Sequence, residues 1–163
     1  DYAMLLLMCT YGLGADEVIR LTLDDIDWQA ATLRVTRPKT GVAFTLPLLA
    51  GVAHTLVQYL RRARPRHVPT RHVFLSMHVP HARLSCSGPV RQRIIEYARV
   101  AGVEAAFLGS HVMRFSHAAR QMELGTAPKV LGDILGHRDP TSVSAYVRIA
   151  TERLRDMALP VPR

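Results

Sequence analysis

The chain has 163 residues, 48% of them hydrophobic, which is enough for one folded domain with its own core and excludes a disordered segment. The formal net charge is +8, and two lysines stand against nineteen arginines, so the expected partner is a polyanion, nucleic acid first of all. A GC-rich genome would explain the preference for arginine over lysine, but not the excess of basic over acidic residues.

No apolar run approaches the ~20 residues that a membrane-spanning helix needs, so no membrane contact is expected. Cys9 and Cys86 are far apart and lack the spacing of a metal site, which predicts two core residues in a reducing cytoplasm. The chain opens directly on an apolar helical pattern without a signal peptide, and we expect it to be a piece of a longer protein.

The first half of the chain begins with helical patterns. Residues 2–11 are mostly apolar and predict a buried helix, which Gly12 and Gly14 end. A second helix is expected over residues 15–23, with acidic residues in its first turn, where the helix dipole favours them.

A change of period then predicts a β-hairpin. Residues 32–36 and 42–48 alternate as strands do, and the turn at 37–41 between them carries Lys39 at its tip. Helical spacing returns over residues 50–64, with apolar side chains on one face.

The second half is mainly helical. The basic stretch at 61–71 is expected to be a solvated loop or a patch that contacts phosphates, and residues 73–76 a short strand. Helices are predicted over residues 87–102, 109–125, 127–136, 139–149 and the start of 151–163. Ser110 is the expected N-cap of the second of these, and Gly125 its C-terminal stop. The fold class is therefore α+β, mainly α with a small antiparallel β-sheet, in a single domain over residues 1–163.

Several side chains along this pattern could carry chemistry on a phosphate. His111 and Arg114 are three residues apart on one helix face, a proton carrier beside a fixed fork of donors, although such pairs are also common on helix surfaces. Lys39 is a lysine where the chain otherwise prefers arginine, and a lysine can act as a general acid or contact phosphate, or be an ordinary turn residue. His137 follows a helix end, and Tyr146, nine residues on, is either a packing residue or a nucleophile.

In their order along the chain, these residues make the sequence resemble the tyrosine recombinase (phage integrase) family almost from end to end. Four segments carry the resemblance: "YGLGADEVIRLTLDDIDW", "LRVTRPKTGVAFTLPL", "GSHVMRFSHAARQMELG" and "LGDILGHRDPTSVSAYVRI". The last segment, with Leu-Gly-His followed by the tyrosine, is the most specific of the four. The resemblance implies the fold of the recombinase catalytic domain and site-specific DNA recombination or integration, as in bacterial mobile elements.

The resemblance also implies a role for each candidate residue. Tyr146 would attack a scissile DNA phosphate and form a 3′-phosphotyrosyl link, and Lys39 would protonate the leaving 5′-oxygen. Arg114 would hold the non-bridging oxygens, His111 would assist proton transfer, and His137 would support the phosphate or orient the tyrosine. No metal or other cofactor is required. The expected partners are double-stranded DNA and other recombinase protomers, four of them in a synapse.

Further contacts to DNA phosphates are expected from four arginines outside this catalytic set: Arg37, Arg91, Arg93 and Arg138. His117 is expected to be structural, because a zinc site with His111 would lack further ligands. The N-terminal DNA-clamping domain of the family, and the first part of its catalytic domain, are expected to precede this chain.

One position departs from the family pattern. The family places an arginine after Gly-Leu in its first motif, and here that position is Gly14. Arg20 lies six residues further along a helix and should point elsewhere, and the loss of one such donor typically lowers the rate by about 10²–10³. Glycine also leaves space into which an arginine from elsewhere could enter. If the gap is real, Gly14→Arg should raise cleavage.

Three hypotheses follow from the sequence. The first is an active recombinase that is slow or whose missing arginine is supplied by another part of the protein. The second is a degenerate member of the family that binds DNA but barely cleaves it. The third is a helix-turn-helix regulator built from residues 127–149, although the small side chains over residues 140–148 are poorly suited to reading bases.

Overall fold

The computed structural model describes residues 1–104 and 108–136, so three predicted site residues, His137, Arg138 and Tyr146, lie outside the described part of the chain. Six α-helices, one 3₁₀ turn and three strands occur in that part: α1 (Tyr2–Tyr11), α2 (Ala15–Ile19), η1 (Leu23–Asp25), β1 (Ile26–Asp27), β2 (Thr32–Thr36), β3 (Ala43–Pro47), α3 (Ala50–Arg62), α4 (Gly88–Val100), α5 (Ser110–Glu123) and α6 (Pro128–Leu135). The α+β class predicted from the sequence is confirmed.

The three strands form one antiparallel sheet in the order β1-β2-β3. Leu33 and Val35 of β2 are fully buried, and they face Leu46 and Phe44 of β3 across the ladder. The predicted hairpin is therefore correct to within one residue at each end. Its turn, residues 37–41, starts with Arg37 and carries Lys39.

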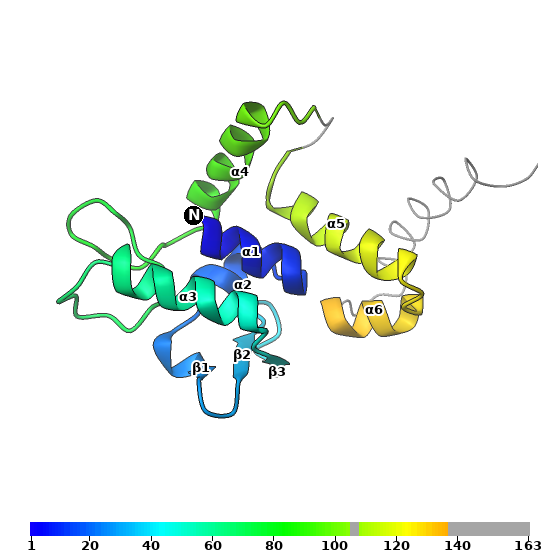
Figure 1. Ribbon diagram of the computed structural model, residues 1–163, viewed down its shortest axis with the longest axis horizontal. Helices are drawn as coiled ribbons and strands as arrows, with labels where there is room; N and C mark the ends of the chain where they lie inside the picture. Colours follow the sequence, from blue (N-terminus) through cyan, green and yellow to red (C-terminus); the bar gives the residue numbers. More distant parts are fainter. Residues whose placement is uncertain (105–107, 137–163) are drawn as a thin grey trace, which may run out of the picture.

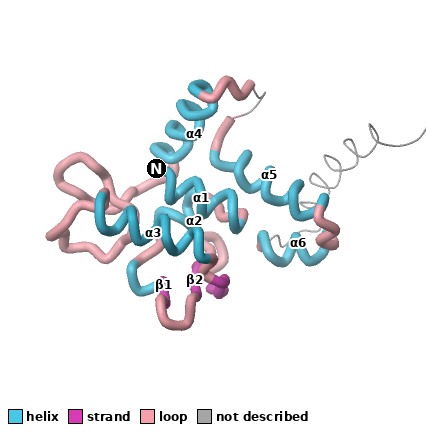
Figure 2. Tube along the Cα trace, in the orientation of Figure 1, coloured by secondary structure: helices cyan, strands magenta, loops and turns pink. Residues whose placement is uncertain are grey.

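The main core gathers around α1. Leu7 and Met8 on this helix are fully buried, and so is Val18 of α2. Leu56 of α3 belongs to the same core and is 1% exposed. Figure 1 shows α1 between α3 and α5, and α1 contacts both of these helices and α2. The long connection between α3 and α4 contains no helix and runs as loop in Figure 2.

A second, smaller core joins α5 and α6. It consists of Ala118, Leu131 and Leu135, with Met122 packed against it. The αL conformation of Gly136, with φ of 69°, ends α6. Since residue 137 follows directly, α6 and its last turn fix where the C-terminal segment leaves the described structure.

One sequence-based boundary and one predicted strand are wrong. The second helix stops at Ile19 instead of residue 23, because a 3₁₀ turn begins there, in which the Asp25 carboxylate accepts hydrogen bonds from the main-chain N–H and the hydroxyl of Thr22. Residues 73–76 do not form a strand; only isolated bridges, Thr22 to His72 and Leu75 to Arg83, occur there. Val73, Phe74 and Leu75 are nevertheless buried, so their apolar pattern marked packing and not sheet pairing.

The predicted cap and the predicted core cysteines are also wrong. Ser110 is the first residue of α5, preceded by Gly109, and no side-chain hydrogen bond caps the helix. Both Cys9 and Cys86 are exposed. The buried positions of α1 follow a helical repeat through Leu7, Met8 and Tyr11 that leaves Cys9 off the buried face, and Cys86 lies in the loop before α4. None of the helices in the described ranges is long and apolar enough to cross a membrane.

Candidate catalytic site

A buried glutamate marks the site. The loop from Gly12 to Gly14 separates α1 from α2, and Gly12 adopts the αL conformation with φ of 66°, which glycine reaches without strain. The main-chain N–H of Gly14 donates a 2.6 Å hydrogen bond to the Glu17 carboxylate. Glu17 is 6% exposed and is the only buried polar or charged residue among those described. A buried carboxylate needs positive partners, and two arginines supply them.

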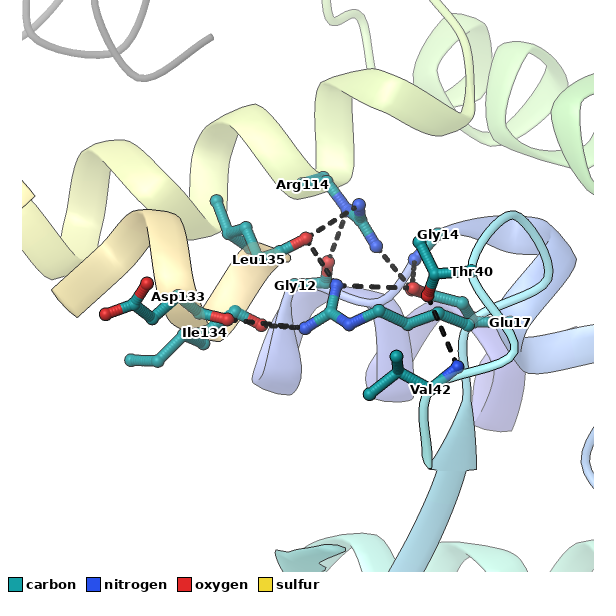
Figure 3. Close-up of polar contacts among 10 residues, drawn as sticks. Gly12, Gly14, Glu17, Thr40, Val42, Arg114, Asp133, Ile134 and Leu135 are labelled. Atoms are coloured by element: carbon teal, nitrogen blue, oxygen red, sulfur yellow. Dashed lines mark hydrogen bonds and ion pairs between the residues drawn. The ribbon is translucent and has the colours of Figure 1, made fainter. Parts of the chain in front are cut away.

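The first partner is Arg114, which reaches across from α5. Its Nη2 group forms an ion pair with the Glu17 carboxylate, and its Nε–H donates a 2.7 Å bond to the Gly12 carbonyl. Its Nη1 lies 3.5 Å from the carbonyl oxygen of Leu135 at the end of α6. Figure 3 shows Arg114 facing Gly12, Glu17 and Leu135. Three segments distant in the sequence therefore meet at this one guanidinium.

The second partner is Arg37, at the start of the hairpin turn. Its Nη1 lies 3.8 Å from a Glu17 oxygen and donates a 2.5 Å bond to the Leu135 carbonyl. Its Nη2 donates a 2.7 Å bond to the Ile134 carbonyl, and its guanidinium carbon stands 4.4 Å from the centre of the Phe44 ring. These contacts tie the hairpin to the last turn of α6. We call Arg37, Arg114 and Glu17 the arginine cluster.

The charges of the arginine cluster do not balance. The side chains of Arg37, Arg114 and Glu17 are 13%, 18% and 7% exposed, so two cations and one anion lie largely out of water. Burial lowers the pKa of Arg37; Glu17 opposes that change and Arg114 adds to it. An arginine nevertheless stays protonated in proteins, so the cluster keeps one net positive charge in a place where it attracts an anion.

The other predicted residues lie around this cluster to different degrees. His111 is exposed in the first turn of α5, three residues before Arg114, as the spacing predicted. Lys39 is exposed in the hairpin turn, two residues after Arg37. Whether their side chains converge with His137 and Tyr146 stays a prediction, because those two residues lie outside the described ranges.

The arginines predicted to contact DNA have different surroundings. Arg91 and Arg93 are exposed on α4, and Arg93 forms a 2.7 Å ion pair with Glu96 one turn on. Arg37 is instead engaged by the protein itself. Two arginines of the basic stretch 61–71 are likewise held, Arg64 by the carbonyls of Thr70 and His72 and Arg71 by the carboxylate of Asp24.

His117 is held against α1, in agreement with a structural role. Its Nδ1 lies 3.1 Å from the Cys9 carbonyl oxygen, and its ring packs beside Gly12. Burial lowers the pKa of His117, Arg114 lowers it further, and the contact to the Cys9 carbonyl raises it. No group of three or more His, Cys, Asp or Glu side chains that could hold a metal ion occurs within residues 1–104 and 108–136.

The sequence patterns do not single out Glu17 as a site residue, nor do they reveal the place of Arg37. They mark Glu17 only as an acidic residue in a first helical turn. A signal is nevertheless present, because Ala15, Val18 and Ile19 around it are all buried and an acid in such a helix must find a partner.

Comparison with known proteins decides the family. The model of the phage integrase family matches residues 1–153. The chain belongs to the phage integrase family. That match includes residues 127–149, the segment that the regulator hypothesis would make a helix-turn-helix.

Curated relatives agree with this family. A putative integrase/recombinase, y4gC, of Sinorhizobium fredii is 35% identical over 164 residues, covering 99% of this chain and 83% of the relative. The tyrosine recombinase XerD of Vibrio vulnificus is 28% identical over 157 residues, covering 96% of this chain and 51% of the relative. The chain thus spans most of one integrase relative and about half of a XerD recombinase.

Solved structures agree on the fold. A crystal structure of the XerA recombinase matches with a TM-score of 0.80 at 20% identity, covering 96% of this chain and 56% of that one. The XerH recombinase, in a post-cleavage complex with a palindromic difH substrate, matches with a TM-score of 0.79 at 16% identity, covering 95% and 44%. The predicted family, fold and classification as a tyrosine-type site-specific recombinase are therefore confirmed.

Proposed function

We propose that this integrase-family chain cleaves and rejoins one strand of double-stranded DNA at a specific site through a covalent link to Tyr146. The observation that supports this most is Arg114, the arginine of His-x-x-Arg, which is held by the Gly12 carbonyl, the Glu17 carboxylate and the carbonyl of Leu135, two residues before His137. A guanidinium fixed in this way binds a phosphate without having to be ordered first, so it stabilises charge that develops in the transition state.

The proposed reaction balances without any added group. The phenolic oxygen of Tyr146 attacks the phosphorus and gives its proton, with the help of His111, to solvent water, and the bond from phosphorus to the 5′-oxygen breaks. Lys39 gives a proton to that oxygen, which leaves as a 5′-hydroxyl. The phosphotyrosyl ester keeps the energy of the phosphodiester, so attack by a 5′-hydroxyl reverses the steps and rejoins a strand.

His111 and His137 have supporting roles in this proposal. His111 is exposed one helical turn from Arg114, where it can hydrogen-bond the same phosphate and take part in moving the tyrosine proton. His137 is the residue that follows Gly136, the C-cap of α6, in the sequence. We propose that it supports the phosphate or orients Tyr146.

The proposed partners are DNA and further copies of the recombinase. The net charge of +8 suits a polyanion, and Arg91, Arg93 and Arg138 are proposed to contact phosphates along the duplex. The XerH structure was solved with DNA, which supports the same partner here. Assembly of four protomers in a synapse, and a place on the bacterial nucleoid, are proposals that follow from the family.

A second candidate function is DNA binding with little cleavage. Gly14 favours it, because the first-motif arginine that the resemblance implies is absent there. On this alternative the arginine cluster would still hold a phosphate, while the rate of cleavage would be low.

Covalent capture tests the proposal whatever the target sequence is. The full-length protein is incubated with fragmented genomic DNA from its host, the mixture is denatured, and DNA that remains attached to protein is sequenced. We expect one enriched site in the wild type and in Tyr2→Phe, which alters an exposed tyrosine of α1, and no attached DNA in Tyr146→Phe. Site-specific binding without any covalent product in the wild type would overturn the proposal in favour of binding alone.

A further inference from the structure

Position 14 points into the arginine cluster, although glycine puts no side chain there. The backbone of Gly14 has φ of −73° and ψ of 153°, which every residue type adopts easily, so the turn does not require glycine. A Cβ at this position would lie 3.3 Å from Nη2 of Arg114 and 3.4 Å from a Glu17 oxygen. An arginine at position 14, as in the family's first motif, would therefore extend beside Arg114 and Glu17.

Arg37 reaches the same carboxylate from another element. Its guanidinium lies beside the Glu17 carboxylate, with which Arg114 also forms an ion pair. Both arginines donate to the Leu135 carbonyl, Arg37 at 2.5 Å and Arg114 at 3.5 Å. The partial negative charge at the end of α6 and the face of the Phe44 ring both favour a cation there. The guanidinium groups of Arg37 and Arg114 thus lie beside the same group, the Glu17 carboxylate, and each can donate several hydrogen bonds.

Two guanidinium groups repel each other, and one carboxylate compensates for only one of them. Holding both largely out of water costs free energy that an anion between them would offset. The arginine cluster has a net charge of one positive unit. A phosphodiester carries one negative charge and would neutralise it.

We propose that Arg37 replaces the missing first-motif arginine and is a catalytic residue, binding the scissile phosphate together with Arg114. This inference rests on the proposed function. It assigns Arg37 to the reacting phosphate instead of to the DNA backbone beside it. It also changes the expectation for Gly14→Arg: with Arg37 in place, a third guanidinium meets a single carboxylate, and cleavage does not rise.

A set of four proteins tests the proposal on the captured target site, in a duplex nicked so that the cleaved strand cannot be rejoined. The rate of covalent product is measured for the full-length wild type, Arg37→Ala, Gly14→Arg and the double variant. We expect Arg37→Ala to lower the rate by about 10²–10³, as for the loss of one transition-state donor, with DNA binding changed less than tenfold. Gly14→Arg alone should not exceed the wild type, and Gly14→Arg in the Arg37→Ala background should recover at least tenfold.

Arg34→Ala is the matched control, because Arg34 is an exposed arginine of the same hairpin outside the arginine cluster, and it should cleave at the wild-type rate. Urea unfolding of every variant separates folding from chemistry, since Arg37 also holds the end of α6. Cleavage by folded Arg37→Ala at the wild-type rate, or a rise in cleavage for Gly14→Arg alone, would overturn the role of Arg37 and leave the proposed function standing. The absence of covalent product in both the wild type and Gly14→Arg would overturn the proposed function, and the inference with it.

Discussion

At the scale of single residues, the charges of the site are organised by Glu17. This carboxylate accepts a hydrogen bond from the Gly14 main chain and forms ion pairs with Arg37 and Arg114, so it joins α2, the hairpin and α5. Without its negative charge, two guanidinium groups would face each other in a place with little water. Its contribution is therefore larger than that of an ion pair on the surface.

Glu17→Gln should destabilise the protein by about 3 kcal/mol, because the amide keeps an acceptor for the Gly14 N–H but leaves two partly buried arginines uncompensated. Urea unfolding followed by circular dichroism measures the loss. Glu96→Gln is the control, since it removes an exposed partner of Arg93 and should cost less than about 1 kcal/mol. Equal losses in the two variants would contradict the importance given to the cluster.

The lowered pKa of His117 predicts that the stability of the protein depends on pH. Burial and Arg114 lower its pKa below the ordinary value of 6.5. The His117 ring therefore binds a proton more weakly in the folded chain than in the unfolded chain. The free energy of unfolding should be unaffected by His117 above that value, and should fall as the pH drops through it toward the lower folded pKa.

The comparison of urea midpoints at pH 7.5 and pH 5.5 tests this. His117→Gln should lose less stability on acidification than the wild type. His54→Gln, which alters an exposed histidine on α3, should lose as much as the wild type. The burial of His72 also lowers its pKa, so the decrease in His117→Gln should be reduced but not abolished. An unchanged decrease in His117→Gln would show that this ring titrates freely.

At the scale of the elements, the stability of α6 depends on contacts with its C-terminal end. Its own core is small, with Leu131 and Leu135 packed against Ala118 of α5. Arg37 and Arg114 bind carbonyls of its last turn, which satisfies groups that a helix end leaves without partners. The arginine cluster therefore holds the last turn of α6 against the hairpin and α5.

Gly136→Ala tests this dependence. The glycine has φ of 69°, where an alanine costs about 1 kcal/mol, and a Cβ there would also overlap the guanidinium of Arg37. Gly125→Ala is the matched control: Gly125 has φ of 87°, with no neighbouring atom within 4 Å of a Cβ among the described residues. We expect faster amide hydrogen exchange over residues 128–136 in Gly136→Ala only, with a larger loss of stability than in Gly125→Ala. Similar effects in the two variants would mean that backbone strain alone limits position 136.

At the scale of the whole molecule, local patterns predicted most elements but not all their ends. The apolar repeat of α1, the alternation of β2 and the glycine after α6 each arise from neighbours in the chain, so the sequence shows them directly. The end of α2, the packing of residues 73–75 and the exposure of Cys9 depend on which face meets another element. Hydrophobicity alone cannot distinguish packing in a core from pairing in a sheet.

By itself, the sequence determined the fold class, the family and five candidate catalytic residues, because motif order and periodicity are properties of the chain. Only the tertiary structure decided that Glu17, Arg37 and Arg114 meet beside Gly14, since they are brought together by the packing of α2, the hairpin, α5 and α6. The sequence shows a missing arginine at position 14; the structure shows that Arg37 and Arg114 both lie beside the Glu17 carboxylate, which the Gly14 N–H contacts. The reason is physical: a phosphate is bound by charge at a position in space, and the chain can bring that charge there from more than one element.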